Sequence, residues 1–292
     1  MTPTVAEEVR LMPRSIAPED CNPDPQWLMP EAMWKRIEPL LPAETPTGKG
    51  TKGGRPAADR RRTLDAIFSV LRTGGQWKAL PRSLGSGSTA HAYFQRLVGL
   101  GVFEQLWRVA LAEYDKAKGI QWQWQALDGT MTKAPLGAEA VGANPTDRAK
   151  TGTKRSLLTD GAGVLLAVVG DGANRHDSKR VEATLNSVQA IPPDPATEQN
   201  LCLDKGFDYP HVEQLVRDYA YHPHIRSRGE EARDLAELPG YRARRWVVER
   251  THSWMNRFRR LLTRWEKKKA NFLSLIHLAC AYITFRAAGV LG

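Results

Sequence analysis

The chain has 292 residues, 41% of them hydrophobic and 25% charged, and its formal net charge is +10. These proportions are ordinary for a globular protein of one large domain or two smaller ones, and the charge favours a polyanionic partner, either nucleic acid or an anionic membrane surface. No apolar run approaches the roughly 20 residues of a spanning helix, so a membrane role is disfavoured. The N-terminus lacks a signal-peptide layout, and the three scattered cysteines form no zinc or redox pair. We therefore expect a cytoplasmic protein.

The first part of the chain is predicted to be helical. Residues 1–26 are polar and rich in proline, which predicts a disordered N-terminus. We assign 27–118 to a helical domain for DNA binding or dimerisation. A helix-turn-helix DNA reader and a plain helical bundle both fit this pattern. Apolar spacings of three and four predict helices starting at Trp27, over 58–72, around Tyr93 and over 102–118, with a basic loop at 43–56.

The remaining residues, 119–292, read as an α/β domain. Strands come first and then alternate with helices, which is typical of a mixed sheet. The Asp160-Gly161 pair between two strands is a hairpin signal. The predicted strands are 122–127, 156–159, 164–169, 201–203 and 222–225, and the predicted helices are 178–188, 210–219, 244–265 and 272–288.

Two aspartates stand where predicted strands end. Asp128 follows Ala126-Leu127, and Asp204 follows Leu201-Cys202-Leu203. The carboxyl ends of strands in α/β sheets commonly host ligands, and the glycine near each aspartate allows close approach. Taken singly, an acid is far more often a solvated surface charge or a turn former than a catalytic group.

Glu249 is placed by its angle on the helix predicted at 244–265. At 100° per residue it lies opposite the apolar side formed by Val247, Thr251 and Trp254. Two strand-end aspartates and a helix glutamate would suit a hard cation such as Mg²⁺, which takes oxygen ligands. The pattern alone does not choose this trio, because the same region also holds Asp160, Asp171, Asp177 and Asp208.

Residues 242–269 carry eleven Lys and Arg against two Glu, which is nine of the ten net positive charges. Such a density would neutralise phosphates and give salt-dependent binding. A solvated helix face and a basic amphipathic membrane helix are the alternatives. The tryptophans and the lack of compensating acids favour nucleic acid. Lys154, Arg155, Arg226 and Arg228 extend this predicted surface, and His222 and His224 are interpreted as packing or phosphate contacts.

The chain resembles the DDE transposases of bacterial insertion sequences, in particular the insertion-sequence-five family, from Trp27 onward. The block around Glu249 and its order after Asp128 and Asp204 are specific, whereas LDGT alone is not. The helical part resembles the same family through GGRPAADRRRTLDAIFSVLRTGGQWKALP from Gly53. The other matching stretches are LDGTMTKAPLG, NPTDRAKTGTKRSLLTDGAG, DGANRHDSK, LCLDKGFDY, HIRSRGEE and RRWVVERTHSWMNRFRRLLTRWEKK.

This resemblance implies a ribonuclease-H-like catalytic domain behind the helical one. The family's three acids map onto Asp128 on the central first strand, Asp204 on the fourth and Glu249 on a following helix. A Tyr and an Arg often precede the Glu and a basic residue follows it, for which Tyr241, Arg244 or Arg245, and Arg257 are candidates. The spacing offers two choices for the Arg. Some relatives carry a large insertion before the Glu, for which this chain has no room.

The resemblance also implies a chemistry. Asp128 would bridge two Mg²⁺ ions, with Mn²⁺ as a substitute, and Asp204 and Glu249 would each complete one site. One ion activates water or a DNA 3′-hydroxyl, and the other stabilises the leaving oxygen. The partners would be the terminal inverted repeats and target DNA at the bacterial nucleoid, bound by a homodimer or larger homo-oligomer. The residues chosen to hold DNA are Lys154, Arg155, Lys205, Arg245, Arg250, Arg257 and Arg260.

Two other functions remain open at this point. A metal-dependent nuclease or resolvase of the same fold would cut DNA without joining it. A non-catalytic DNA-binding protein, derived from a transposase, would bind without cutting. The presence of all three acids in a continuous reading frame argues against the second.

Overall fold

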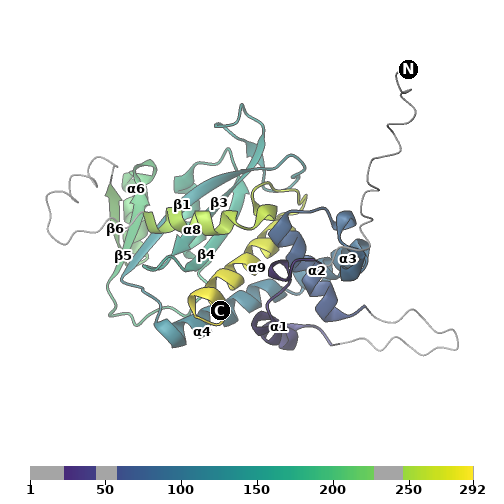
Figure 1. Cartoon of the computed structure of the whole chain (residues 1–292). Coiled ribbons are helices and arrows are strands. Elements are labelled where there is room, and N and C mark those ends of the chain that lie inside the picture. Colours follow the sequence, from purple (N-terminus) through teal and green to yellow (C-terminus); the bar gives the residue numbers. More distant parts are fainter. Residues whose placement is uncertain (1–22, 44–57, 227–245, 292) are drawn as a thin grey trace, which may run out of the picture.

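A computed structural model of the chain describes residues 23–43, 58–226 and 246–291 (Figure 1). Most of the expected disordered N-terminus and of the basic loop at 43–56 lies outside the described residues. Arg228, Tyr241, Arg244 and Arg245 lie outside them as well.

The four helices predicted for the N-terminal part are confirmed. Asp59 caps the second by accepting a hydrogen bond from the Arg62 amide, and Gly74, at a φ of 74°, ends it. This helix ends at Thr73 and the next begins at Gly87. That connection is longer than the three or four residues of a helix-turn-helix, whereas only Leu100 and Gly101 separate the third helix from the fourth. Both the helix-turn-helix reader and the plain bundle therefore stay predictions. The helices are α1 (Glu31–Ile37), α2 (Arg60–Thr73), α3 (Gly87–Gly99) and α4 (Val102–Lys118).

A six-stranded mixed sheet forms the second part. β1 lies at its centre, antiparallel to β3 on one side and parallel to β5 on the other. β3 pairs antiparallel with β4 and with the short β2, and β5 pairs parallel with β6. The strands are β1 (Trp124–Lys133), β2 (Gly142–Ala143), β3 (Thr151–Thr159), β4 (Leu165–Gly172), β5 (Gln199–Asp204) and β6 (Tyr221–Arg226).

This strand order confirms the ribonuclease-H-like fold class. The long strands run β4-β3-β1-β5-β6, so the first strand is central and the fourth long strand, β5, lies beside it. Asp128 lies on β1, Asp204 ends β5, and Glu249 lies on the later helix α8 (Trp246–Asn256). The order of elements that the resemblance implied is therefore the order observed.

The position of Asp128 within its strand was predicted wrongly. β1 continues through Lys133 instead of ending at Leu127, so Asp128 lies in its middle. The extension is held by β3, whose residues 152–157 pair with 128–133. Gly129 fits at this position because the Asp177 carboxylate lies against it and leaves no room for a side chain.

The prediction of a long helix over 244–265 was also wrong, in its second half. α8 ends at Asn256, and a 3₁₀ turn over Arg259–Leu261 follows. The chain then joins the edge of the sheet, where the Arg264 amide donates to the Lys133 carbonyl over 2.8 Å. The helix predicted at 178–188 is shorter too: it is a 3₁₀ turn over Asp177–Arg180 and then α5 (Val181–Leu185), whereas α6 (Pro210–Asp218) is as predicted.

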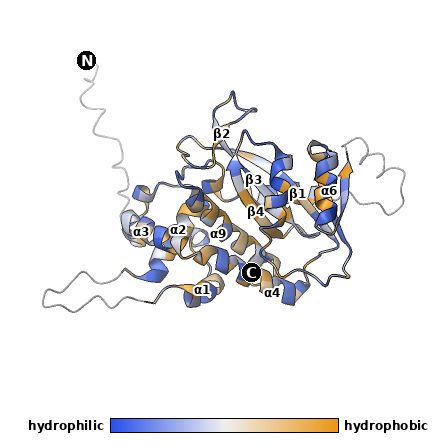
Figure 2. Ribbon diagram, turned by 180° about the vertical axis from the view of Figure 1, so that it is seen from behind, coloured by the Kyte–Doolittle hydropathy of each residue, from blue (hydrophilic) through white to orange (hydrophobic). Residues whose placement is uncertain are grey.

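The last helix, α9 (Lys269–Ala287), is the centre of the core. It packs against α4 on one side and against β4 and α8 on the other, and Figure 2 shows its hydrophobic colouring. By length and composition alone α9 could span a membrane, but 12 of its residues are buried inside the protein. One hydrophobic cluster runs from Met29 to Leu291 across the predicted domain boundary after 118, which stays a prediction.

Candidate active site

Asp128 and Asp204 lie on neighbouring parallel strands. The register pairs Trp124, Gln125 and Ala126 of β1 with Asn200, Leu201 and Cys202 of β5. Continuing this spacing by two residues brings Asp128 level with Asp204, and residues paired in this way point to the same face of a sheet. Both carboxylates reach solvent in part: the Asp128 side chain is 27% exposed, and Asp204 is half-buried.

Each aspartate is held by a nearby backbone amide. Asp128 accepts a hydrogen bond from the amide of Gly129 over 2.7 Å, and Asp204 accepts one from the amide of Gly206. In both cases one carboxylate oxygen is engaged and the second is left for another partner. For Asp128 the second oxygen, Oδ2, lies 3.6 Å from Nε2 of His252 on α8.

Helix α8 brings Glu249 to the same region. It packs on β1 and β3 with Val247, Val248, Thr251, His252 and Met255 buried. Glu249 is exposed and lies one turn before His252, about 4.5 Å along the axis at 1.5 Å per residue. Since residues three apart are neighbours on a helix surface, Glu249 lies beside His252, whose ring is close to Asp128.

The three acids thus stand on three adjacent elements without forming a ready-made ligand cluster. Across residues 23–43, 58–226 and 246–291, no group of three or more His, Cys, Asp or Glu is placed to hold a metal ion. The donor set itself fits Mg²⁺, because all three are carboxylates with oxygen donors at or near the surface. Side-chain rearrangement would be needed to bring them onto shared ions.

The other acids that the sequence offered have structural partners. Asp160 is fully buried in the turn between β3 and β4, where it accepts bonds from the amides of Ala162 and Val164 and from the Tyr114 hydroxyl. Burial raises the pKa of the Asp160 carboxyl and that of the Tyr114 phenol. Asp171 pairs with Arg175, and Asp208 pairs with Lys205.

Lys154 and Arg155 were predicted to contact DNA, and their burial contradicts this. The Lys154 side chain is 8% exposed, and its Nζ lies 2.8 Å from Asp177. Arg155 is 2% exposed and donates from Nη2 to Asn256 of α8 over 2.8 Å. Burial lowers the pKa of the Arg155 guanidinium to about 10. Both side chains are buried within the fold and are not available to a phosphate.

The predicted contact of Arg260 with DNA is wrong for the same reason. Its side chain is 8% exposed and its Nε donates to the buried Glu266 carboxylate over 2.7 Å. Arg264, another charge of the basic segment, is fully buried. Part of the charge that the sequence assigned to a DNA surface therefore lies inside the fold.

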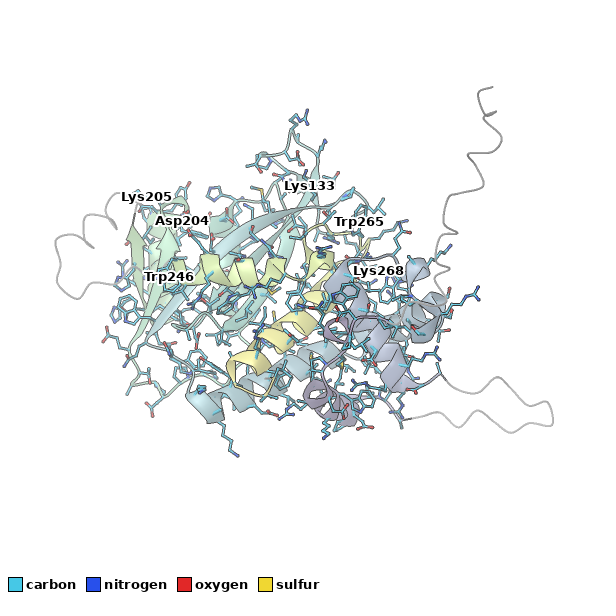
Figure 3. The ribbon with its side chains drawn as sticks, in the orientation of Figure 1. Lys133, Asp204, Lys205, Trp246, Trp265 and Lys268 are labelled. Carbon is cyan, nitrogen blue, oxygen red and sulfur yellow. The ribbon has the colours of Figure 1, made fainter. Side chains whose placement is uncertain are left out.

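Three of the predicted DNA contacts do lie at the surface. Lys205 is exposed beside Asp204, as Figure 3 shows. Arg250 is half-buried between the rings of Trp246 and Trp254, at 4.5 and 4.8 Å from their centres, and donates to the Ala162 carbonyl over 2.6 Å. Arg257 is exposed and, together with Arg72 and Arg286, lines a pocket of about 360 Å³.

Two histidines near the sheet differ in their roles. His224 stacks on Trp124 with ring centres 4.8 Å apart and contacts the Asn200 side chain, so its role is packing. His252 was not among the predicted site residues, although it lies beside Asp128. Its position three residues after Glu249, on the same side of the helix, could have identified His252 as a site residue from the sequence.

Two family models match the chain. The model described as "Putative transposase of IS4/5 family" matches residues 29–107, and "Transposase DDE domain" matches residues 124–284. The second covers the whole sheet, α8 and nearly all of α9, including the three acids.

Curated relatives come from Burkholderia cepacia. The "Putative transposase for insertion sequence element IS402" is 35% identical over 154 residues, which cover 50% of this chain and 69% of the relative. The "Insertion element IS402 uncharacterized 16.2 kDa protein" is 30% identical over 120 residues, covering 40% and 81%. Among solved structures, the Mos1 mariner paired-end complex with Mn aligns with 87% of this chain and 86% of its own, at 11% identity and a TM-score of 0.27.

The match to the DDE domain extends over more than half of the chain and over the sheet on which the strand order was read. The helical model accounts for the segment before it. The chain is therefore a DDE transposase of the IS4/IS5 type.

Proposed function

We propose that this transposase cuts DNA at the ends of an insertion element and joins the freed ends to target DNA, with Asp128, Asp204 and Glu249 as its catalytic acids. The observation that carries the proposal is the parallel register of β1 and β5, which ends two residues before Asp128 and Asp204, together with the approach of His252 on α8 to within 3.6 Å of Asp128. Asp128 and Asp204 are the acids that lie on this central pair of strands, and both are partly exposed.

The three carboxylates would hold divalent ions, with Mg²⁺ or Mn²⁺ as the hard cations that oxygen ligands prefer. Such ions, when bound, would supply activation of the attacking hydroxyl and charge stabilisation at the leaving oxygen. The chain's own contribution is positional. β1 and β5 fix two carboxylates at one level of the sheet, and the packing of α8 holds the third on the facing helix.

DNA would be held by exposed cations around this site. Lys205 lies next to Asp204, and Arg257 lies just past the end of α8. The helical bundle of residues 27–118 would read the terminal inverted repeats. Two ends must be joined in one event, so the working form would be a homodimer or larger assembly. Its substrate would place the protein at the bacterial nucleoid in the cytoplasm.

A cleavage assay tests the catalytic trio. The substrate is duplex DNA carrying the element end that flanks the gene, incubated with Mg²⁺. Asp128→Asn, Asp204→Asn and Glu249→Gln should each lower the cleavage rate by about two to four orders of magnitude, which corresponds to losing several kcal/mol of transition-state stabilisation. Binding of the same DNA should change little. EDTA should abolish cleavage by the unaltered protein.

Asp171→Asn is the matched control, because Asp171 is a half-buried acid on β4 with Arg175 as its partner. It should cut at nearly the normal rate. Full activity of Asp128→Asn would overturn the proposal. A second substrate with a pre-cut 3′ end separates transposase from nuclease: joining to target DNA supports the proposal, whereas cutting without joining assigns a nuclease of the same fold.

A further inference from the structure

A patch of exposed apolar and basic side chains lies at the far end of the sheet from Asp204. Trp265 is 44% exposed and Leu262 is 50% exposed, and three consecutive exposed lysines, Lys267, Lys268 and Lys269, follow. Lys133, whose side chain is 65% exposed, adjoins them through the bridge between Lys133 and Thr263. Figure 3 shows Lys133, Trp265 and Lys268 together at this end, away from Asp204 and Lys205. We call these six side chains the Trp265 patch.

Trp265 is exposed on a backbone that is fixed on both sides. Arg264 before it is fully buried and donates to the carbonyls of Glu139, Ala140 and Glu266 over 2.6 to 3.1 Å. Glu266 after it is buried and paired with Arg260. The alternation of buried, exposed and buried residues presents the indole outward from a rigid loop. Little conformational entropy is lost when such a side chain binds a partner.

The charges around Trp265 favour a polyanion over another protein surface. The patch holds four exposed lysines, and the acids beside it are Asp147, which pairs with Lys133 at 3.4 Å, and Glu139, which accepts the Lys269 amide. The same patch on a second copy of this chain would be repelled by these lysines on approach. An aromatic ring among cations is instead a combination that contacts bases and binds phosphates.

The strand gives the distance from the catalytic centre. Lys133 follows Asp128 by five residues on β1, which is about 17 Å at 3.4 Å per residue. One strand of B-form DNA advances about 3.4 Å per nucleotide, so this span matches about five base pairs. We propose that the DNA duplex runs along β1 and that the Trp265 patch binds it about five base pairs from the cleaved phosphate, with the indole against the groove edge of a base and the lysines on adjacent phosphates. This inference rests on the proposed function for the position of the cut.

Photocrosslinking locates the contact. 5-Iododeoxyuridine is placed at single positions from two to nine base pairs on either side of the cleavage site, and crosslinking is done in EDTA so that the DNA stays uncut. Crosslinks to Trp265 should peak near the fifth base pair on one side. Trp265→Ala should abolish that peak and weaken binding about 5- to 30-fold, the range for losing one apolar contact. Trp265→Phe should retain most of both signals.

Ile191 provides the control, since it is an apolar side chain that is 83% exposed but is followed in the sequence by Asp194 instead of lysines. Ile191→Ala should leave both the crosslink and the affinity unchanged. Replacing Lys267, Lys268 and Lys269 by Ala should lower the slope of log Kd against log salt concentration by about one for each phosphate that is no longer neutralised.

The inference is overturned if Trp265→Ala binds and crosslinks as the unaltered protein does, or if it changes oligomeric state while DNA binding is intact. Because the crosslinking needs no cleavage, its result is independent of the catalytic assay. A Trp265 crosslink with an inactive enzyme would support the patch and reject the proposed function. Normal cleavage with no Trp265 crosslink would support the proposed function and reject DNA binding by the patch.

Discussion

Lys154 and Arg155 are neighbours in the sequence but lie in opposite environments. Successive residues of a strand point to opposite faces, so Lys154 faces α5 and the preceding turn, whereas Arg155 faces α8 and α9. Lys154 meets the Asp177 carboxylate, which also pairs with Arg180. Arg155 donates to the neutral Asn256 amide, with Cys280 nearby.

The difference shows that two adjacent basic residues on a strand do not by themselves form a basic surface. One face of β3 buries its cation with a counter-charge, and the other buries a cation that pairs with no carboxylate in the described part of the chain. Burial therefore lowers the pKa of Arg155 to about 10, since the charged form has lost water without gaining a carboxylate there. The two faces should respond to mutation with opposite signs, and this can be tested from the strongest effect downward.

Asp177→Asn should have the largest effect on stability. It leaves the Lys154 and Arg180 side chains, 8% and 3% exposed, without their shared carboxylate. Stranding buried charge in this way typically costs about 3–5 kcal/mol, which chemical denaturation would measure as a lower free energy of unfolding. Glu213→Gln is the control, because it removes an exposed ion pair with Arg217 and should cost less than about 1 kcal/mol. Equal stability of the two variants would contradict this account of the Asp177 face.

His277 on α9 extends the comparison to a half-buried base that can release its proton. Burial lowers the pKa of its ring from 6.5 to about 4, with Glu104 raising it and Arg108 lowering it further. The unfolded chain then binds a proton between those pH values and the folded chain does not, so stability falls as pH drops from 6.5 toward 4. The loss should reach up to about 3 kcal/mol.

Thermal melts of the unaltered protein and of His277→Leu between pH 7 and pH 4.5 check this. The variant should lose Tm less steeply over that interval, whatever its stability at pH 7. Exposed His211 supplies the control, since His211→Leu should keep the normal slope. Parallel slopes for His277→Leu and the unaltered protein would show that His277 does not contribute.

Gly129→Ala tests how tightly the Asp177 face is packed. A Cβ at 129 would lie 2.5 Å from Oδ1 of Asp177, which is already held by Lys154 and Arg180. Such overpacking typically costs about 1–3 kcal/mol, which denaturation would detect. Gly99→Ala, where a Cβ would meet none of the described atoms within 4 Å, should cost nothing by comparison. A neutral Gly129→Ala would mean that the Asp177 side chain moves away freely.

The two faces of β3 also show which parts of the site could be predicted from the sequence and which could not. Periodicity located nearly every element, and the ordered acids placed Asp128, Asp204 and Glu249 on the expected strands and helix. The periodicity of the segment after Glu249 did not reveal that α8 ends at Asn256, because Arg264 and Glu266 find their partners only in the folded sheet and turn. Burial of Lys154, Arg155 and Arg260 depends on tertiary neighbours in the same way, and formal charge carries no information about it.

The smallest predicted effect is the sharpest test of the comparison, because it concerns adjacent residues changed to the same side chain. Lys154→Met leaves Asp177 paired with Arg180 and should cost about 1.5 kcal/mol, the lower end of the range for a hydrogen bond to a charged group. Arg155→Met removes a buried cation that pairs with no described carboxylate and should be neutral or stabilising by about 1 kcal/mol. Chemical denaturation of the two variants gives the signs directly. A clear loss of stability in Arg155→Met would mean that the Asn256 bond to α8 outweighs the desolvation of the guanidinium, and the two faces of β3 would then be alike.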